Sequence, residues 1–138
     1  MKSKCVLVAE DDENDVLFLQ RAFRQAEISA RLEVAHDGQE AIDYLSGLGK
    51  YVNRELYPLP CLVMLDLKMP RKTGMEALEW IRGREDLRAL PVIIFSSSVH
   101  PEEIDQAYRL GASAFLTKPS GVKERLELAQ RIKQSWLP

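Results

Sequence analysis

The chain alternates short apolar runs with longer segments in which apolar residues recur every three or four positions. The apolar runs occupy positions 5–9, 32–35, 61–65, 92–95 and 113–117. The segments of helical period occupy about 14–26, 38–45, 75–84, 101–110 and 122–136, and we place Tyr108 and Val122 on the inward faces of the last two. Strand-length runs that alternate with helical segments are typical of βαβ units around a parallel sheet. The pattern predicts an α/β fold of five strands and five helices.

The residues that follow four of these runs share one kind of chemistry. In chain order they are Glu10 and Asp11, Asp66, Ser96 and Lys118. The carboxyl ends of parallel strands lie at the same edge of a sheet, and open α/β sheets bind ligands at that edge. We therefore expect these side chains to meet in one crevice that suits a divalent metal and a phosphoryl group.

A carboxylate can attack a phosphoryl group only if the repulsion between the two anions is relieved. Mg²⁺ serves this purpose, because it is held by one or two carboxylates together with phosphate oxygens. We expect Asp11 and Asp66 to hold Mg²⁺ (or Mn²⁺), with Glu10 acting on the metal directly or through water. Lys118 and Ser96 would contact the phosphoryl oxygens. Asp66 would then be the nucleophile and form an aspartyl phosphate.

Each of these residues also has a purely structural interpretation. In that interpretation Asp12 or Asp15 serves only as a helix N-cap, a role that acidic residues often take. A lysine at a strand end is commonly a solvated charge, and Ser96 begins a run of three serines that suits a turn. The combination favours the functional interpretation, because every residue type that the chemistry needs occurs on a separate run.

Composition restricts the class of protein further. Apolar residues make up 46% of the 138 residues and charged residues 29%, and the net charge is −2. These values are typical of a folded globular domain, and no basic excess indicates nucleic acid or an anionic membrane. No apolar stretch approaches the length that spans a bilayer, and the N-terminus lacks a signal-peptide core. We expect a cytoplasmic protein.

Three further features have no assigned chemistry. The stretch 46–60 is irregular and long for a connection inside a domain, so it is either functional or a neutral surface insertion. Cys5 and Cys61 begin two strand-like runs and could lie close together, although buried small residues in a reducing compartment are the simpler interpretation. His36 and His100 have no partner at ligand spacing and are read as ordinary surface residues.

Four motifs, in this order and with these separations, resemble the receiver domain of bacterial two-component response regulators. They are LVAEDD at 7–12, MLDLKMPRKTG at 64–74, PVIIFSSS at 91–98 and GASAFLTKP at 111–119. The resemblance covers essentially the full length, as a single receiver domain over residues 1–138. It implies a flavodoxin-like doubly wound (βα)5 three-layer sandwich with a parallel sheet of order 2-1-3-4-5.

The resemblance also implies roles for individual residues. Asp66 falls on the phosphoacceptor position, Glu10 and Asp11 on the acidic metal pocket, and the backbone carbonyl of Lys68 on a further metal ligand. The phosphoryl-binding and switch positions are Ser96, Ser97, Phe115 and Lys118. Lys68 and Ser98 occupy the variable positions that tune dephosphorylation. Phe115 has no hydroxyl, which excludes a switch that relies on a tyrosine hydrogen bond.

Receivers accept phosphate from a sensor histidine kinase or a phosphotransfer protein, so the resemblance implies one of these partners. The extended loop at 47–60 and the ending RIKQSWLP at 131–138 resemble the single-domain regulators associated with bacterial phytochrome kinases. In that subgroup receivers tend to form homodimers through the face built from the last helices. We hypothesise that phosphorylation draws Ser96 inward, that Phe115 turns into the vacated space, and that this face changes.

Two other functions compete with this interpretation. An aspartate-nucleophile phosphatase would typically carry a second Asp two residues after the nucleophile, where this chain has Lys68. A phosphorylation-independent interaction module would typically have lost the acceptor, the acidic pair or the lysine, all of which are retained. A nucleotide-binding domain is disfavoured, because no glycine-rich turn follows the first run.

Overall fold

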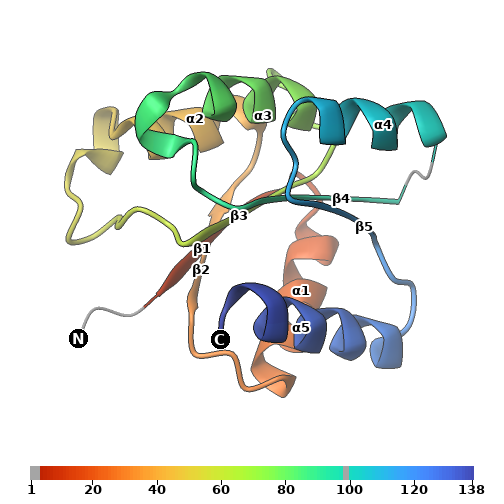
Figure 1. Ribbon diagram of the computed structural model, residues 1–138. Helices are drawn as coiled ribbons and strands as arrows, with labels where there is room; N and C mark the ends of the chain where they lie inside the picture. The colour runs from red at the N-terminus through yellow and green to blue at the C-terminus, as the bar shows by residue number, and fades with distance from the viewer. Residues whose placement is uncertain (1–3, 98–99) are drawn as a thin grey trace.

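A computed structural model of the chain describes residues 4–97 and 100–138 (Figure 1). Five parallel strands form a single sheet in the order β2-β1-β3-β4-β5, which confirms the predicted order. The strands are β1 (Cys5–Ala9), β2 (Arg31–Ala35), β3 (Leu62–Leu65), β4 (Val92–Ser96) and β5 (Ala114–Thr117). The flavodoxin-like, doubly wound architecture expected from the sequence is therefore present.

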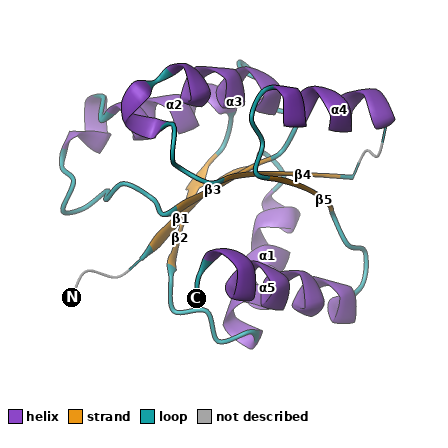
Figure 2. Cartoon of the chain, in the orientation of Figure 1, coloured by secondary structure: helices purple, strands orange, loops and turns teal. Residues whose placement is uncertain are grey.

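Helices cover both faces of the sheet and produce the three layers seen in Figure 2. On one face lie α2, α3 and α4, and on the other lie α1 and α5. Their bounds are α1 (Glu13–Gln25), α2 (Gly38–Ser46), α3 (Gly74–Gly83), α4 (Pro101–Arg109) and α5 (Val122–Trp136). Two short 3-10 helices, η1 (Gly49–Val52) and η2 (Glu85–Leu87), lie in the loops after α2 and α3.

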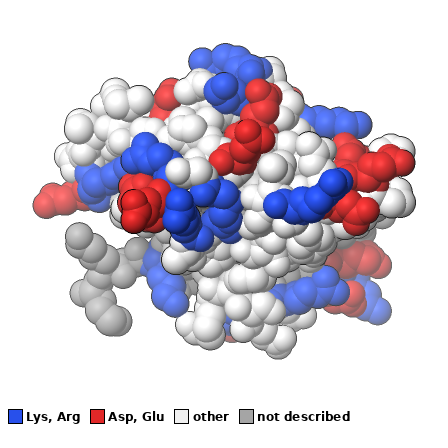
Figure 3. All heavy atoms as spheres, turned by 45° about the horizontal axis from the view of Figure 1, so that its top comes forward, with Lys and Arg blue, Asp and Glu red and all other residues white. Residues whose placement is uncertain are grey.

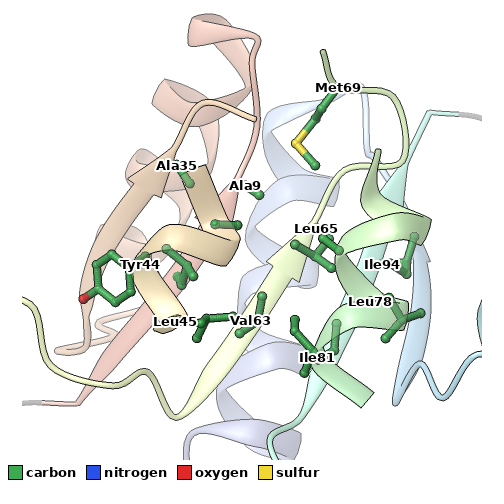
Figure 4. Close-up of a cluster of buried hydrophobic side chains, with 14 of the residues drawn as sticks. Ala9, Ala35, Tyr44, Leu45, Val63, Leu65, Met69, Leu78, Ile81 and Ile94 are labelled. Carbon is green, nitrogen blue, oxygen red and sulfur yellow. The ribbon is translucent and has the colours of Figure 1, made fainter. Parts of the chain in front are cut away.

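The core is divided by the sheet into two apolar clusters. Alternate residues of a strand point to opposite faces, so Leu7 and Val63 pack under α2 and α3, whereas Val6 and Leu62 pack over α1 and α5. Figure 4 shows the first cluster, in which strand residues meet the inner faces of α2 and α3. The strands β1, β3 and β4 are buried along their whole length, which explains their uninterrupted apolar sequence.

Side-chain caps fix where the helices begin near the carboxyl edge of the sheet. Asp12 accepts hydrogen bonds from the amides of Asn14 and Asp15 and so caps α1. Thr73 and Glu76 form a reciprocal capping box at the start of α3. Each cap ends a loop that leaves a strand of the sheet, and each therefore limits how the residues of that loop can move.

Two expected core positions are wrong. The side chain of Tyr108 is 50% exposed and that of Val122 is 65% exposed. The hydroxyl of Tyr108 accepts a hydrogen bond from the amide of Phe115 in the edge strand, so its ring lies beside the sheet rather than over it. Val122 lies in the first turn of α5, ahead of the buried residues by which that helix contacts the core.

The long connection between α2 and β3 is an ordered structure. Tyr44 of α2 packs against Tyr51 and Tyr57 with ring centroids 4.9 and 6.0 Å away, and its hydroxyl donates to the Pro58 carbonyl at 2.8 Å. The Arg54 guanidinium donates to three backbone carbonyls, those of residues 44, 45 and 57. Two of these carbonyls belong to the last turn of α2, which has no helical partners for them. Arg54 therefore ties the loop to the end of the helix.

We predict that Arg54→Ala lowers the free energy of unfolding by about 1–3 kcal/mol, because it leaves part-buried carbonyls without a charged donor. Urea denaturation measures the change. Arg131→Ala, on the exposed side of α5, is the matched control and should leave the stability within about 0.5 kcal/mol of wild type. Equal stability of the two variants would contradict a structural role for the Arg54 contacts.

Candidate functional site

Backbone hydrogen bonds continue past the strand ends and hold the first residues of two loops. The amide of Glu10 donates to the carbonyl of Ala35 at 2.9 Å, and the amide of Asp66 donates to the carbonyl of Ala9 at 3.0 Å. Both residues are therefore fixed to the sheet although they lie just beyond β1 and β3. Their side chains are also buried, with 1% of Glu10 and 7% of Asp66 exposed.

An acidic cluster forms where β1 and β3 end side by side. Ligand oxygens of Glu10, Asp11 and Asp66 all lie within 4.8 Å of one another, as the sequence predicted. Carboxylate oxygens are the ligands that Mg²⁺ and Mn²⁺ prefer, so the donor set fits such an ion. The two oxygens of Glu10 already accept hydrogen bonds, one from Lys118 and one from the amide of Asp12. This arrangement favours an indirect contribution of Glu10, through water, over direct ligation.

Lys118 places its ammonium group among three carboxylates. The amide of Lys118 donates to the carbonyl of Ser96, which fixes the backbone just after β5. Its Nζ lies 2.5 Å from Glu10 Oε1, 2.8 Å from Asp15 Oδ2 and 3.4 Å from Asp66 Oδ2. The sequence predicted the first and third of these neighbours but treated Asp15 only as a possible cap. No local signal distinguished Asp15, because its contact depends on the end of a strand 103 positions away.

Burial and charge act in opposite directions on this cluster. Burial raises the pKa of Glu10 to about 7, although the hydrogen bond from Lys118 opposes the rise. Burial disfavours the charge of Lys118, but its hydrogen bonds to Asp15 and Glu10 and the field of Asp66 outweigh that effect and raise its pKa. The lysine therefore stays protonated and is the internal counter-charge of the acidic cluster.

Close backbone packing positions the loop after Asp66. A Cβ on Gly74 would lie 2.2 Å from the carbonyl oxygen of Asp66, so only glycine fits there. Arg71 has a positive φ of 62° and its guanidinium pairs with Asp37, the N-cap of α2, at 2.8 Å. Lys68, two residues after Asp66 in this loop, is exposed.

Ser96 and Phe115 lie on the same face of neighbouring strands. In the register of β4 and β5, Phe115 is opposite Ile94, and Ser96 follows two residues later on the same side. Ser96 is buried, whereas Phe115 is half-buried and packs against the cluster beneath α3 and α4. Ser97 is exposed, and Ser98 lies outside the described residues.

The two cysteines lie at the opposite edge of the sheet. The amide of Cys61 donates to the carbonyl of Cys5 at 2.9 Å, so the strands are neighbours as expected. Both thiols are free: that of Cys5 lies 3.6 Å from the Tyr44 hydroxyl, and that of Cys61 lies 3.4 Å from the Cys5 carbonyl. His36 is an exposed residue that contacts Glu40 on α2.

This constellation and the fold have a counterpart in a known family. The model of the response regulator receiver domain matches residues 6–133. The chain belongs to the response regulator receiver family. The match includes every residue assigned to the site, and with the fold it identifies this protein as a receiver of two-component signalling rather than a conventional enzyme.

Relatives of this receiver include phytochrome response regulators, as the extended loop and the C-terminal sequence indicated. The response regulator Rcp1 of Synechocystis sp. is 31% identical over 134 residues, which cover 97% of this chain and 89% of that protein. Its Mn²⁺-bound form has a TM-score of 0.86, with 97% of this chain and 94% of that one covered. The metal in that structure agrees with the acidic donor set found here.

Two further solved structures agree closely with the receiver. RPA3017, described in red light signalling of R. palustris, is 36% identical with a TM-score of 0.92, covering 97% of this chain and 94% of that chain. The phosphorylated cyanobacterial phytochrome response regulator RcpA is 29% identical with a TM-score of 0.90, covering 99% and 95%. In the described part of the receiver, no helix is both long and apolar enough to cross a bilayer.

The raised pKa of Glu10 predicts a pH dependence of the metal-free receiver. The pKa rises from an ordinary 4.5 to about 7, so the folded chain retains a proton that the unfolded chain loses. The resulting stabilisation is complete below the lower pKa and is lost as the pH rises through the higher one. We therefore compare the free energy of unfolding at about pH 5 and about pH 8 in the presence of a chelator. Between these values the free energy of unfolding of wild type should fall by about 1–3 kcal/mol more than that of Glu10→Gln.

Denaturation at several pH values measures this difference. The variant Glu79→Gln, which removes an exposed carboxylate of α3, should follow the wild-type curve. Parallel curves for wild type and Glu10→Gln would show that the pKa of Glu10 is not raised in the folded receiver.

Proposed function

We propose that Asp66 is the phosphoacceptor of this receiver and takes its phosphoryl group from a phosphohistidine. The donor is a sensor histidine kinase or a phosphotransfer protein. The observation that carries the proposal is the position of Asp66, a buried carboxylate that shares a 4.8 Å cluster with Glu10 and Asp11 and lies 3.4 Å from Lys118. A nucleophile, a metal-ligating set and a fixed cation are the parts that phosphoryl transfer requires.

The transfer can be written with this chain's own groups. An oxygen of Asp66 forms a bond to phosphorus while the phosphorus–nitrogen bond of the donor breaks, and the imidazole leaves with that electron pair. Lys118 offsets the charge of a phosphoryl oxygen, and the Ser96 hydroxyl donates to another. A divalent ion held by Asp11, Asp66 and the Lys68 carbonyl would supply the remaining charge neutralisation. The product is an aspartyl phosphate, which water later hydrolyses.

The alternatives have less support. An aspartate phosphatase needs an acid or base near the nucleophile, but two residues after Asp66 the chain places the exposed Lys68. An interaction module that needs no phosphorylation would have no use for three carboxylates held against one lysine. The variable positions Lys68 and Ser98 remain our candidates for tuning dephosphorylation, since both flank the site in sequence.

The register of β4 and β5 supports a switch between the site and the surface of the receiver. We propose that the phosphoryl group draws the Ser96 hydroxyl toward it, which frees volume on the side of the sheet under α4. Phe115, opposite Ile94 on that same side, then turns inward. The amide of Phe115 is bonded to the hydroxyl of Tyr108, so a movement of Phe115 also changes the contact of β5 with α4. The outer surface of α4, β5 and α5 therefore reports the state of Asp66.

This output surface is where we propose that a partner or a second copy binds. Tyr108 and Val122 are exposed on it, and both flank β5, which is an edge of the sheet. The similarity to Rcp1 and RcpA makes a phytochrome-type kinase our proposed donor. Charges of both signs are interspersed over the neighbouring face of α2, α3 and α4, as Figure 3 shows. We propose no nucleic-acid or membrane partner, and we place the protein in the cytoplasm.

Replacing the acceptor tests the proposed function. Incubation of wild type with Mg²⁺ and acetyl phosphate should give acid-labile, hydroxylamine-sensitive phosphate, because the carboxylate of Asp66 becomes an acyl phosphate. Asp66→Asn should give none, and wild type in chelator should give at least tenfold less. Asp105→Asn, an exposed carboxylate on α4, is the matched control and should label like wild type. Equal labelling of Asp66→Asn and wild type would remove Asp66 as the acceptor.

The switch has its own readout. Beryllofluoride, which imitates the phosphoryl group on a carboxylate, should shift the NMR signals of the Phe115 ring and of Tyr108 in wild type. In Ser96→Ala the same probe should leave these signals largely in place, because the hydroxyl that links the site to β5 is missing. A sizing column run on the same samples shows whether the change drives dimerisation. Unchanged Phe115 signals in fully bound wild type would end the coupling hypothesis.

A further inference from the structure

Asp15 is a carboxylate of the site that neither metal ligation nor phosphoryl transfer uses. It lies in the first turn of α1, and its Oδ2 accepts a hydrogen bond from Lys118 at 2.8 Å. We propose that Asp15 restrains Lys118 in the unphosphorylated receiver and thereby opposes the phosphorylated state. The inference rests on the proposed function, because it assigns a regulatory role at the same site.

The hydrogen bonds of the Lys118 ammonium group oppose its movement toward Asp66. Lys118 has three N–H donors. One donates to Glu10 and one to Asp15, at 2.5 and 2.8 Å, whereas the Nζ–Oδ2 separation from Asp66 is 3.4 Å. The lysine is thus held closest to two carboxylates that do not receive the phosphoryl group. A phosphoryl oxygen on Asp66 can accept from the third N–H, but drawing the ammonium group toward Asp66 lengthens its bonds to the other two carboxylates.

The burial of the two carboxylates decides which bond lengthens more readily. The side chain of Glu10 is fully buried, so loss of the lysine would leave its Oε1 without a hydrogen-bond partner in the core, a costly state. The side chain of Asp15 is 33% exposed, so water can solvate its carboxylate when the lysine moves. Release of Asp15 is therefore the less costly route, and Asp15 is the partner that Lys118 exchanges for the phosphoryl group.

The surroundings of Asp15 accommodate this exchange. A cavity of about 30 Å³ lies beside it between α1, β4 and α5, and Lys118, Phe95 and Arg125 contribute to its lining. That volume is large enough for a water molecule. The guanidinium of Arg125 is stacked on the ring of Phe18, 3.8 Å from its centroid, so a second cation lines the cavity that Asp15 borders. The exposed third of the Asp15 side chain stays in contact with solvent after the lysine has moved.

Removing the carboxylate should favour the phosphoryl state. Asp15→Asn keeps the shape of the side chain but frees Lys118 and subtracts a negative charge from the cluster. At saturating Mg²⁺, we expect the affinity for beryllofluoride, measured by isothermal titration, to rise roughly three- to tenfold. Titration of each variant with Mg²⁺ alone, done first, gives the metal concentration at which its site is saturated. A difference in beryllofluoride affinity at that concentration then does not reflect a difference in metal affinity.

Two further variants separate this role from a general effect of charge or folding. Glu13→Gln removes a carboxylate from the same first turn of α1, where Glu13 is exposed, and should bind beryllofluoride like wild type. Asp15→Glu restores a carboxylate that can reach the lysine and should return the affinity to within about twofold of wild type. A purely structural role of Asp15 would change the unfolding temperature but would not raise this affinity.

Each outcome is decisive. If wild type binds no beryllofluoride and takes no phosphate from acetyl phosphate, the proposed function fails. If wild type binds but Asp15→Asn equals Glu13→Gln, the restraint is absent while the function stands. Weaker binding by Asp15→Asn would also overturn the inference, because Asp15 would then orient Lys118 toward the phosphoryl group.

Discussion

Lys118 balances a cluster of carboxylates that the fold would otherwise not tolerate. Glu10 and Asp66 are buried, and the exposed Asp11 completes their 4.8 Å cluster, while Asp15 joins it through Lys118. Negative charges on the two buried carboxylates repel each other strongly. A single protonated lysine, held in place by the end of β5, offsets part of that repulsion. The net charge of the cluster stays negative, which suits the divalent cation that we propose it binds.

The geometry of that cluster depends on backbone contacts more than on side-chain packing. Main-chain hydrogen bonds that extend the sheet past its strands fix Glu10, Asp66 and Lys118. Gly74 allows the loop after β3 to lie against the carbonyl of Asp66, with no room for any larger residue. The acidic residues are fixed at the edge of the sheet. In the switch that we propose, movement is therefore confined to the side chains of Ser96, Phe115 and Lys118.

Much of the fold could be read from local patterns. Strands β1, β3 and β4 are buried on both faces, so they appear as unbroken apolar runs, and the helices between them carry a regular apolar stripe. The pattern fails where burial depends on neighbours distant in sequence. Tyr108 and Val122 satisfy the helical spacing of core residues, yet they lie at the margin of the sheet and remain exposed. The ordered structure of the connection 47–60 could not be predicted from local patterns either. It depends on hydrogen bonds from Arg54 to backbone carbonyls of α2.

The sequence by itself determined which residues could do the chemistry. It placed acids, a hydroxyl and a lysine at the ends of strands, and a parallel sheet brings such ends to one edge. Which of these groups pair with each other depends on the tertiary structure. Local patterns made Asp12 and Asp15 equivalent as helix caps, but in the fold Asp12 caps α1 while Asp15 binds Lys118, 103 positions away. The physical reason is that a cap is satisfied within one turn of chain, whereas an ion pair depends on which distant strand ends beside it.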